Sequence, residues 1–134
     1  MDDKVKEKIL IIDDEQGIRD LFCFLLRPKG YDVFTAADGE EGVAMVKKEN
    51  FGIIFLDVHM PKLRGPEVLK IIKQINPKQL VIIFSSSSDP NYVFEENAES
   101  YGAYRCLYKP VEISQILGII SEALSREREK SGGN

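Results

Sequence analysis

The chain has 134 residues, of which 43% are hydrophobic and 30% are charged, and this composition is typical of one globular domain. The net charge is −4 and the basic residues are scattered, which argues against a nucleic-acid-binding surface. The two cysteines, Cys23 and Cys106, form no CxxC pair, so neither a zinc site nor a dithiol redox centre is expected. The apolar runs are too short for a signal peptide or a membrane span, which predicts a cytoplasmic protein.

Five short apolar segments predict five β-strands. Residues 9–12, 53–56 and 80–84 are apolar throughout, as expected of central parallel strands that are covered on both faces. Residues 33–37 and 106–108 are of mixed polarity, which favours the edges of the sheet.

Helical periodicity marks four of the segments that connect or follow these strands. The first helix is expected to end at Pro28 to Gly30, and the third to begin at Gly65-Pro66. Asp38-Gly39 predicts the start of the second helix. Asp89-Pro90 predicts the start of a further helix, although residues 92–101 show no clear apolar stripe. The apolar stripes cover residues 18–26, 43–46, 68–72 and 113–124.

Strand and helix alternate five times, which predicts an α/β fold with a doubly wound parallel sheet and helices on both faces. The expected domain covers residues 1–126. Residues 127–134 are charged and then rich in glycine, and we expect them to form a flexible tail. In such sheets the functional residues lie at the carboxyl ends of the strands.

Polar residues follow four of the predicted strands at that edge. They are Asp13, Asp14, Asp57, Ser85 and Lys109. Taken alone, each has an ordinary structural explanation, such as a helix cap, a turn or a solvated charge. Their combination at one edge of the sheet is what indicates a functional site.

Three carboxylates at one point repel each other by about 4 kcal/mol per close pair at an effective dielectric constant near 20, so they need a cation. Oxygen ligands with positions left for water favour Mg²⁺ over a calcium cage. Lys109 adds a positive charge and Ser85 a hydroxyl. A carboxylate nucleophile, a metal, an ammonium and a hydroxyl are the groups that phosphoryl transfer needs.

Four motifs resemble the receiver domains of two-component response regulators. They are Ile9 to Glu15, Phe55 to Pro61 with Gly65, Ile82 to Ser85, and Gly102-Ala103 leading to Lys109-Pro110. The resemblance spans about residues 8–124. It implies a flavodoxin-like five-stranded parallel sheet in the order 2-1-3-4-5 with five helices, and a stand-alone receiver of the chemotaxis type.

The resemblance also implies a role for each site residue. Asp57 is expected to accept the phosphoryl group, with Ser85 and Lys109 assisting. Asp13, Asp14, Asp57 and the backbone carbonyl of His59 are expected to hold Mg²⁺, with Asp14 as a direct ligand. Glu15 is expected to support the first helix rather than to bind metal.

The expected partners are a sensor histidine kinase or phosphotransfer protein, which supplies the phosphoryl group, and a downstream protein that receives the signal. Neither nucleic acid nor a membrane is expected as a partner. Phe22 falls within the apolar stripe of the first helix, whereas Phe24 lies outside it. Phe24 is either an isolated exposed aromatic residue or part of a docking surface.

The sequence departs from the family pattern in two places. Cys106 stands where the family usually has an aromatic residue three positions before the lysine, and Tyr104 and Tyr108 flank it at the same strand parity. The segment between Ser85 and Gly102 is two residues longer than in the common family pattern. Counting back from Gly102 would therefore select Ser87, in place of Ser85, as the residue that supplies the hydroxyl.

Other interpretations concern His59 and the class of the protein. His59 is interpreted as a loop residue that influences water access to the site, and the alternatives are that it carries a phosphoryl group or binds metal through its side chain. An aspartyl-phosphate phosphohydrolase needs a second catalytic acid two residues after the nucleophile, where this chain has His59. A flavin carrier needs a phosphate-binding loop after the first strand, where this chain has an acidic sequence.

Overall fold

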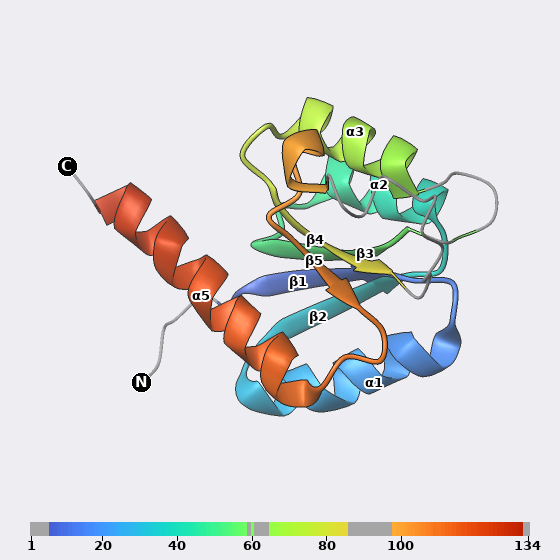
Figure 1. The fold of residues 1–134 in the computed structure, drawn as a ribbon, viewed down its shortest axis with the longest axis vertical. Helices are drawn as coiled ribbons and strands as arrows, with labels where there is room; N and C mark the ends of the chain where they lie inside the picture. The colour runs from blue at the N-terminus through green and yellow to red at the C-terminus, as the bar shows by residue number, and fades with distance from the viewer. Residues whose placement is uncertain (1–5, 59, 61–64, 86–97, 133–134) are drawn as a thin grey trace.

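A parallel sheet of five strands forms the centre of the molecule, in a computed structural model that describes residues 6–58, 60, 65–85 and 98–132 (Figure 1). The strand order is β2-β1-β3-β4-β5, the order that the resemblance implied. The mixed-polarity strands β2 and β5 therefore lie at the edges, as predicted. The strands are β1 (Lys8–Ile12), β2 (Asp32–Ala36), β3 (Ile53–Asp57), β4 (Leu80–Ser85) and β5 (Arg105–Tyr108).

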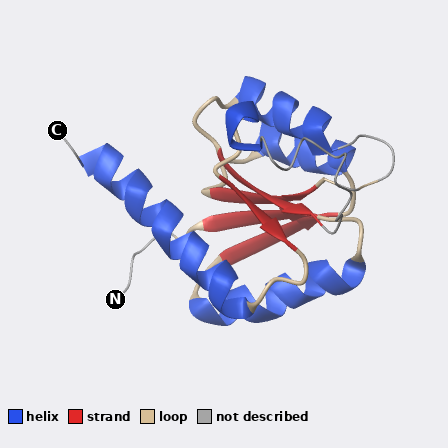
Figure 2. Cartoon of the chain, in the orientation of Figure 1, coloured by secondary structure: helices blue, strands red, loops and turns tan. Residues whose placement is uncertain are grey.

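Helices cover both faces of this sheet, with α2 and α3 on one face and α1 and α5 on the other (Figures 1 and 2). Five helices were expected, and the described residues contain four α-helices. The fourth predicted helix, residues 92–101, falls mostly outside the described residues, and its described end, Ala98–Tyr101, is a 3₁₀ helix, η2. The others are α1 (Gln16–Leu26), η1 (Arg27–Lys29), α2 (Gly39–Lys48), α3 (Gly65–Ile75) and α5 (Ile113–Gly132).

The C-terminal helix α5 runs past the boundary that was expected at residue 126. Its backbone is helical to Gly132, within the segment that the sequence suggested as a flexible tail. Charged residues and serine are compatible with a solvated helix, which explains why composition alone did not reveal its length. The division into a domain and a tail stays a prediction.

The helix boundaries confirm the punctuation in the sequence. Asp38 caps α2 by accepting a hydrogen bond from the Glu41 amide at 2.8 Å, and the Glu41 carboxylate accepts one from the Ala37 amide at 2.7 Å. Gly30 follows η1 with a φ of 96°, in the left-handed region that favours glycine.

The strands bury side chains on both faces, as their apolar sequences predicted. Alternate residues face opposite layers, so Leu10 and Ile12 pack with the α2 and α3 side while Ile9 and Ile11 pack with the α1 and α5 side. All five residues of β3 are buried. This double coverage holds the carboxyl ends of the central strands in fixed positions, where the polar residues follow.

Helix α1 separates its two phenylalanines as its periodicity predicted. Phe22 is only 3% exposed, and its ring centroid lies 5.1 Å from that of Phe55 and 5.2 Å from that of Phe84. Phe24 is 76% exposed.

None of the described helices is both long enough and apolar enough to cross a membrane.

Candidate functional site

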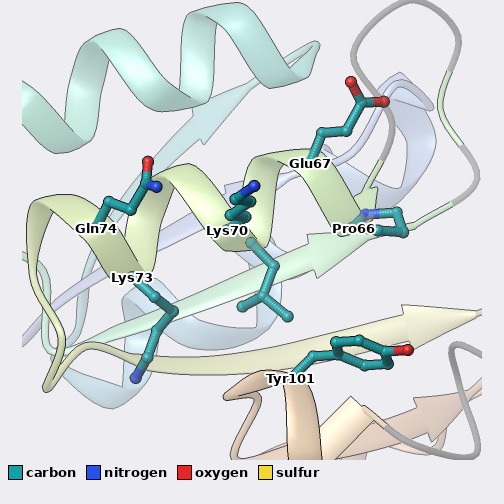
Figure 3. A pocket seen from close by; sticks show the side chains of 7 residues that line it. Pro66, Glu67, Lys70, Lys73, Gln74 and Tyr101 are labelled. Atoms are coloured by element: carbon teal, nitrogen blue, oxygen red, sulfur yellow. The ribbon is translucent and has the colours of Figure 1, made fainter.

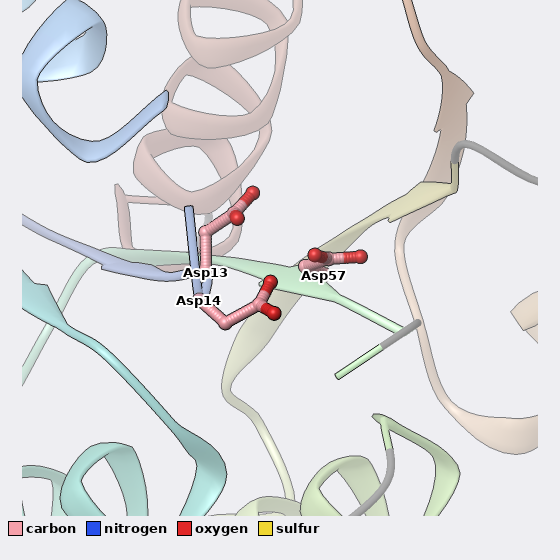
Figure 4. A group of neighbouring side chains, drawn as sticks. All are labelled: Asp13, Asp14 and Asp57. Carbon is pink, nitrogen blue, oxygen red and sulfur yellow. The ribbon is translucent and has the colours of Figure 1, made fainter. Parts of the chain in front are cut away.

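Three carboxylates meet at the carboxyl edge of the sheet, because their strands are neighbours. Strands β1 and β3 pair in register up to Ile12 and Leu56, so the residues that come next, Asp13 and Asp57, lie side by side. One oxygen each from Asp13, Asp14 and Asp57 lies within 4.8 Å of the other two (Figure 4). Asp13 and Asp57 are buried and Asp14 is exposed, so the group opens to solvent on the Asp14 side.

Asp13 is fixed by hydrogen bonds on three sides. Its amide donates to the Ala36 carbonyl at 3.1 Å, and its own carbonyl accepts from Nη1 of Arg19 at 2.7 Å. Its Oδ1 accepts from the amide of Glu15 at 2.9 Å. The second carboxylate oxygen, Oδ2, faces Lys109.

Lys109 brings a positive charge to the carboxylates from the other side. Its amide donates to the Ser85 carbonyl at 2.7 Å, which fixes the backbone of Lys109 against the end of β4. Its Nζ lies 3.1 Å from Oδ2 of Asp13, 3.4 Å from Oε1 of Glu15 and 3.6 Å from Oδ2 of Asp57. The Lys109 ammonium therefore contacts three carboxylates, those of Asp13, Glu15 and Asp57.

The pKa of Lys109 reflects two opposing effects. Burial by itself lowers this pKa, because it disfavours the charged form. The negative charges of Asp57, Asp13 and Glu15, with the hydrogen bond to Asp13, outweigh burial, and the pKa of Lys109 is raised above its ordinary value. Lys109 is therefore charged throughout the neutral range.

Gly65 allows α3 to begin directly against the strand that carries Asp57. A Cβ atom at this position would overlap the Cα of Val58, the residue that follows Asp57. Any larger residue would push the start of α3 away from the site, which explains the glycine eight positions after Asp57.

The charges of the site favour a divalent cation. Three carboxylates against one ammonium leave an excess of negative charge, and two of the carboxylates are buried, where uncompensated charge is costly. The donors are all oxygen atoms, and the exposed Asp14 leaves room for water, which fits Mg²⁺. His59 lies outside the described residues, so the part of its carbonyl stays a prediction.

Ser85 ends β4 opposite Tyr108 and is buried. It therefore lies at the same edge of the sheet as Asp57, whose neighbour in β4 is Phe84. Ser87, the alternative that counting from Gly102 suggested, lies outside the described residues.

The structure adds to one expectation and corrects another. Glu15 was expected to support the first helix, and its carbonyl accepts hydrogen bonds from the Ile18 and Arg19 amides there. Its side chain makes no capping hydrogen bond and contacts Lys109. Tyr104 was placed on the same face as Cys106, yet it packs on the α1 and α5 side while Cys106 packs on the α2 and α3 side. The reason is that Tyr104 precedes β5, where strict alternation does not apply.

Two of the hollows among the described residues flank the sheet. The smaller, of about 390 Å³, adjoins the carboxylates, because Glu15 and Lys109 line it together with apolar residues of α1 and α5. The larger, of about 690 Å³, lies between α3 and Tyr101 and includes none of the three carboxylates (Figure 3). Of these two, the smaller hollow therefore belongs to the site.

Comparisons with known proteins agree with this geometry. Residues 9–121 match the family model of the response regulator receiver domain. Sporulation initiation phosphotransferase F of Bacillus subtilis is 33% identical over 120 residues, which are 90% of this chain and 95% of that protein. The chain spans about half the length, or less, of several transcriptional regulators that it also matches.

Solved structures show the same fold. A CheY-like receiver domain protein from Methanospirillum hungatei is 31% identical, with a TM-score of 0.85 over 94% of this chain and 99% of that one. The response regulator TrrA of Thermotoga maritima, in complex with Mg²⁺-BeF, is 26% identical, with a TM-score of 0.77 over 87% of this chain and 98% of that one. From its matched sequence, its strand order and its acidic site, the chain belongs to the response regulator receiver domain family.

Proposed function

We propose that this chain accepts a phosphoryl group on Asp57 from the phosphohistidine of a sensor kinase or phosphotransfer protein, and passes the signal on by contact with another protein. The observation that carries the proposal is the position of Asp57. It is buried at the end of a central strand, grouped with Asp13 and Asp14, and its Oδ2 lies 3.6 Å from the Lys109 ammonium.

The transfer uses a carboxylate oxygen of Asp57 as the nucleophile. As the new P–O bond forms, the P–N bond of the donor breaks and its electron pair stays on the imidazole nitrogen. Lys109 would neutralise charge on the phosphoryl oxygens, and the Ser85 hydroxyl would donate a hydrogen bond to them. Mg²⁺, held by Asp13, Asp14, Asp57 and the His59 carbonyl, would supply further positive charge there.

We propose that hydrolysis of the aspartyl phosphate by water resets the protein. The same site then serves both steps, which makes the chain a switch whose own residues promote its phosphorylation and dephosphorylation. Proteins of this family are phosphoacceptor switches, in line with this proposal.

The proposed docking surface for the phosphodonor lies on α1 and at the start of α5. The hollow of about 390 Å³ beside Lys109 has apolar walls that include Ile18, Leu21 and Val111, and Phe24 is exposed further along α1. Apolar residues around a reactive centre are suited to a protein partner that must exclude water there.

The proposed compartment is the cytoplasm, in keeping with Cys23 and Cys106, which are both free thiols. The stand-alone arrangement that the sequence suggested stays a prediction.

The proposal is tested by incubating the protein with acetyl phosphate and Mg²⁺. We expect one phosphoryl group per chain, labile in acid and in base, on Asp57. Asp57→Asn should abolish labelling, while Asp20→Asn, which changes an exposed carboxylate on α1, should leave it intact. Full labelling of Asp57→Asn, or labelling of a serine, would contradict the proposal.

A further inference from the structure

We propose that Glu15 is a positioning residue that holds the Lys109 ammonium in the unphosphorylated protein and thereby weakens the retention of a phosphoryl group on Asp57. This inference rests on the proposed function. It gives a role to an acidic residue that the family resemblance leaves outside the metal site.

The backbone of Glu15 is anchored on both sides. Its carbonyl accepts hydrogen bonds from the amides of Ile18 and Arg19, both at 3.1 Å, and so begins α1. Its amide donates to Oδ1 of Asp13 at 2.9 Å. The position of Glu15 relative to the site is thus fixed by the backbone alone.

The side chain of Glu15 does not serve the helix. At an N-cap, the short side chains of Ser, Thr, Asp and Asn are favoured, because they can accept a hydrogen bond from an amide of the first turn. Glu15 occupies this position and makes no such bond. Its carboxylate contacts Lys109 instead.

Glu15 shares the ammonium with Asp57 and with Asp13, whose Oδ2 is the nearest of the three carboxylate oxygens at 3.1 Å. The Nζ of Lys109 is 3.4 Å from the carboxylate of Glu15 and 3.6 Å from that of Asp57. The side chain of Glu15 is 64% exposed and that of Asp57 only 3% exposed, so the two carboxylates attract the ammonium toward solvent and toward the interior respectively. The hydrogen bond from the Lys109 amide to the Ser85 carbonyl holds the backbone of Lys109 in place. Any change in how the ammonium is shared among these carboxylates must therefore come from movement of the lysine side chain.

A phosphoryl group on Asp57 changes this balance. The phosphoryl group carries up to about two negative charges, and its bond to Asp57 removes the charge of the carboxylate, so the site gains about one negative charge next to the ammonium. The ammonium must then turn from Glu15 toward the phosphoryl oxygens. A contact that is stronger in the unmodified state opposes the modified state by the same free energy. Solvent screens the exposed carboxylate, so the expected effect on phosphoryl retention is about threefold.

The test measures the affinity of beryllofluoride, a non-covalent mimic of the phosphoryl group, in the presence of Mg²⁺. Glu15→Gln should bind it about threefold more tightly than the unmodified protein. Asp20→Asn removes an exposed charge from the next turn of α1 and should bind it with unchanged affinity. Unchanged or weaker binding by Glu15→Gln would overturn the inference.

A second background separates positioning from simple charge repulsion. If Glu15 acts by holding the ammonium, the gain from Glu15→Gln should disappear when Lys109→Met is also present. If the gain persists in that background, Glu15 acts by repelling the anion directly, and the inference is wrong.

Urea unfolding without Mg²⁺ supplies a measurement that needs no phosphoryl group. It compares the unmodified protein, Glu15→Gln, Lys109→Met and the variant that carries both substitutions. The two substitutions should shift the unfolding midpoint non-additively, because they remove the same ion pair. Additive shifts would overturn the inference. If neither the unmodified protein nor any variant binds beryllofluoride, the proposed function fails. The comparison of unfolding midpoints still decides whether Glu15 holds Lys109.

Discussion

The three carboxylates of the site differ in their surroundings, although they stand close together. Asp13 and Asp57 are buried and both contact the Lys109 ammonium, which compensates part of their charge. Asp14 is exposed, and the Lys109 contacts do not include it. Asp14 is therefore the carboxylate whose removal costs the folded protein least when no metal is present.

Replacing Asp14 with alanine should stabilise the metal-free protein. The change relieves repulsion with two nearby carboxylates, and solvent screening limits the gain to about 0.5–1 kcal/mol. That gain corresponds to a rise of about 2–4 °C in melting temperature for a domain of this size. Because a proposed ligand is lost, the further rise that Mg²⁺ gives to the unmodified protein should shrink or vanish.

Thermal unfolding with and without Mg²⁺, followed by circular dichroism, measures both effects. Asp20→Ala is the matched control, since it removes an exposed carboxylate of α1 outside the group. A variant at Asp14 that responds to Mg²⁺ as fully as the unmodified protein would show that Asp14 is not a ligand.

Helix α1 has three distinct parts. Its first residues follow the acidic pair, its inner face packs on the sheet through Phe22, and Phe24 projects into solvent from its outer face. The inner face serves stability, and the outer face is available to a partner. The two phenylalanines allow these roles to be tested separately.

Phe24→Ala should slow phosphoryl transfer from a phosphohistidine protein and leave labelling by acetyl phosphate unchanged, because only the protein donor needs a docking surface. Its stability should stay within about 0.5 kcal/mol of the unmodified protein. Phe22→Ala should lose about 3–5 kcal/mol, because it empties a space between Phe55 and Phe84.

Urea unfolding and transfer rates with both donors distinguish these outcomes. If Phe24→Ala slows both donors equally, the effect lies in the phosphorylation site or in folding, and α1 is not the docking surface.

The edge strand β5 is tied to α5 by side chains that precede or begin it. The Tyr104 hydroxyl donates to the Glu122 carboxylate, and the Arg105 guanidinium lies 3.1 Å from the same carboxylate and 4.6 Å from the centre of the Tyr104 ring. Cys106 packs on the opposite face of the sheet. Tyr104 is therefore held away from the face where the family usually places its aromatic residue.

At the scale of the molecule, this arrangement favours one side of the fold for signal transmission. Movement of Ser85 toward a phosphoryl group would leave a space, which neighbouring residues must fill because cavities are costly. Tyr104 is bonded to α5 and cannot fill the space without losing those contacts. We therefore expect the chain between β4 and β5 to respond.

Hydrogen exchange with and without beryllofluoride and Mg²⁺ measures this response. The largest change in exchange should fall between residues 86 and 101, and residues 113–124 of α5 should change little, since their buried side chains stay packed on the sheet. Unchanged exchange over residues 86–101, together with a response in α1 or α5, would refute this route.

The layers of the fold and the residue types of the site follow from patterns in the sequence. Apolar strands such as Ile53–Leu56 can be satisfied only when both faces are covered, and this requirement predicts a parallel sheet with helices on both sides. Polar residues after such strands lie along one edge of the sheet, so the sequence placed Asp13, Asp57 and Lys109 at that edge. The strand order that brings them together came from the family resemblance.

Two features required the folded structure: which carboxylates share the Lys109 ammonium, and which face of the sheet a residue outside a strand packs on. Glu15 and Lys109 are 94 positions apart, and their contact depends on how α1 and the end of β5 sit at the sheet edge, which no local pattern encodes. The face on which Tyr104 packs was predicted wrongly, because side chains alternate between faces only within a strand and Tyr104 precedes β5. Local periodicity reports on regular elements, whereas contacts between their ends depend on packing across the whole domain.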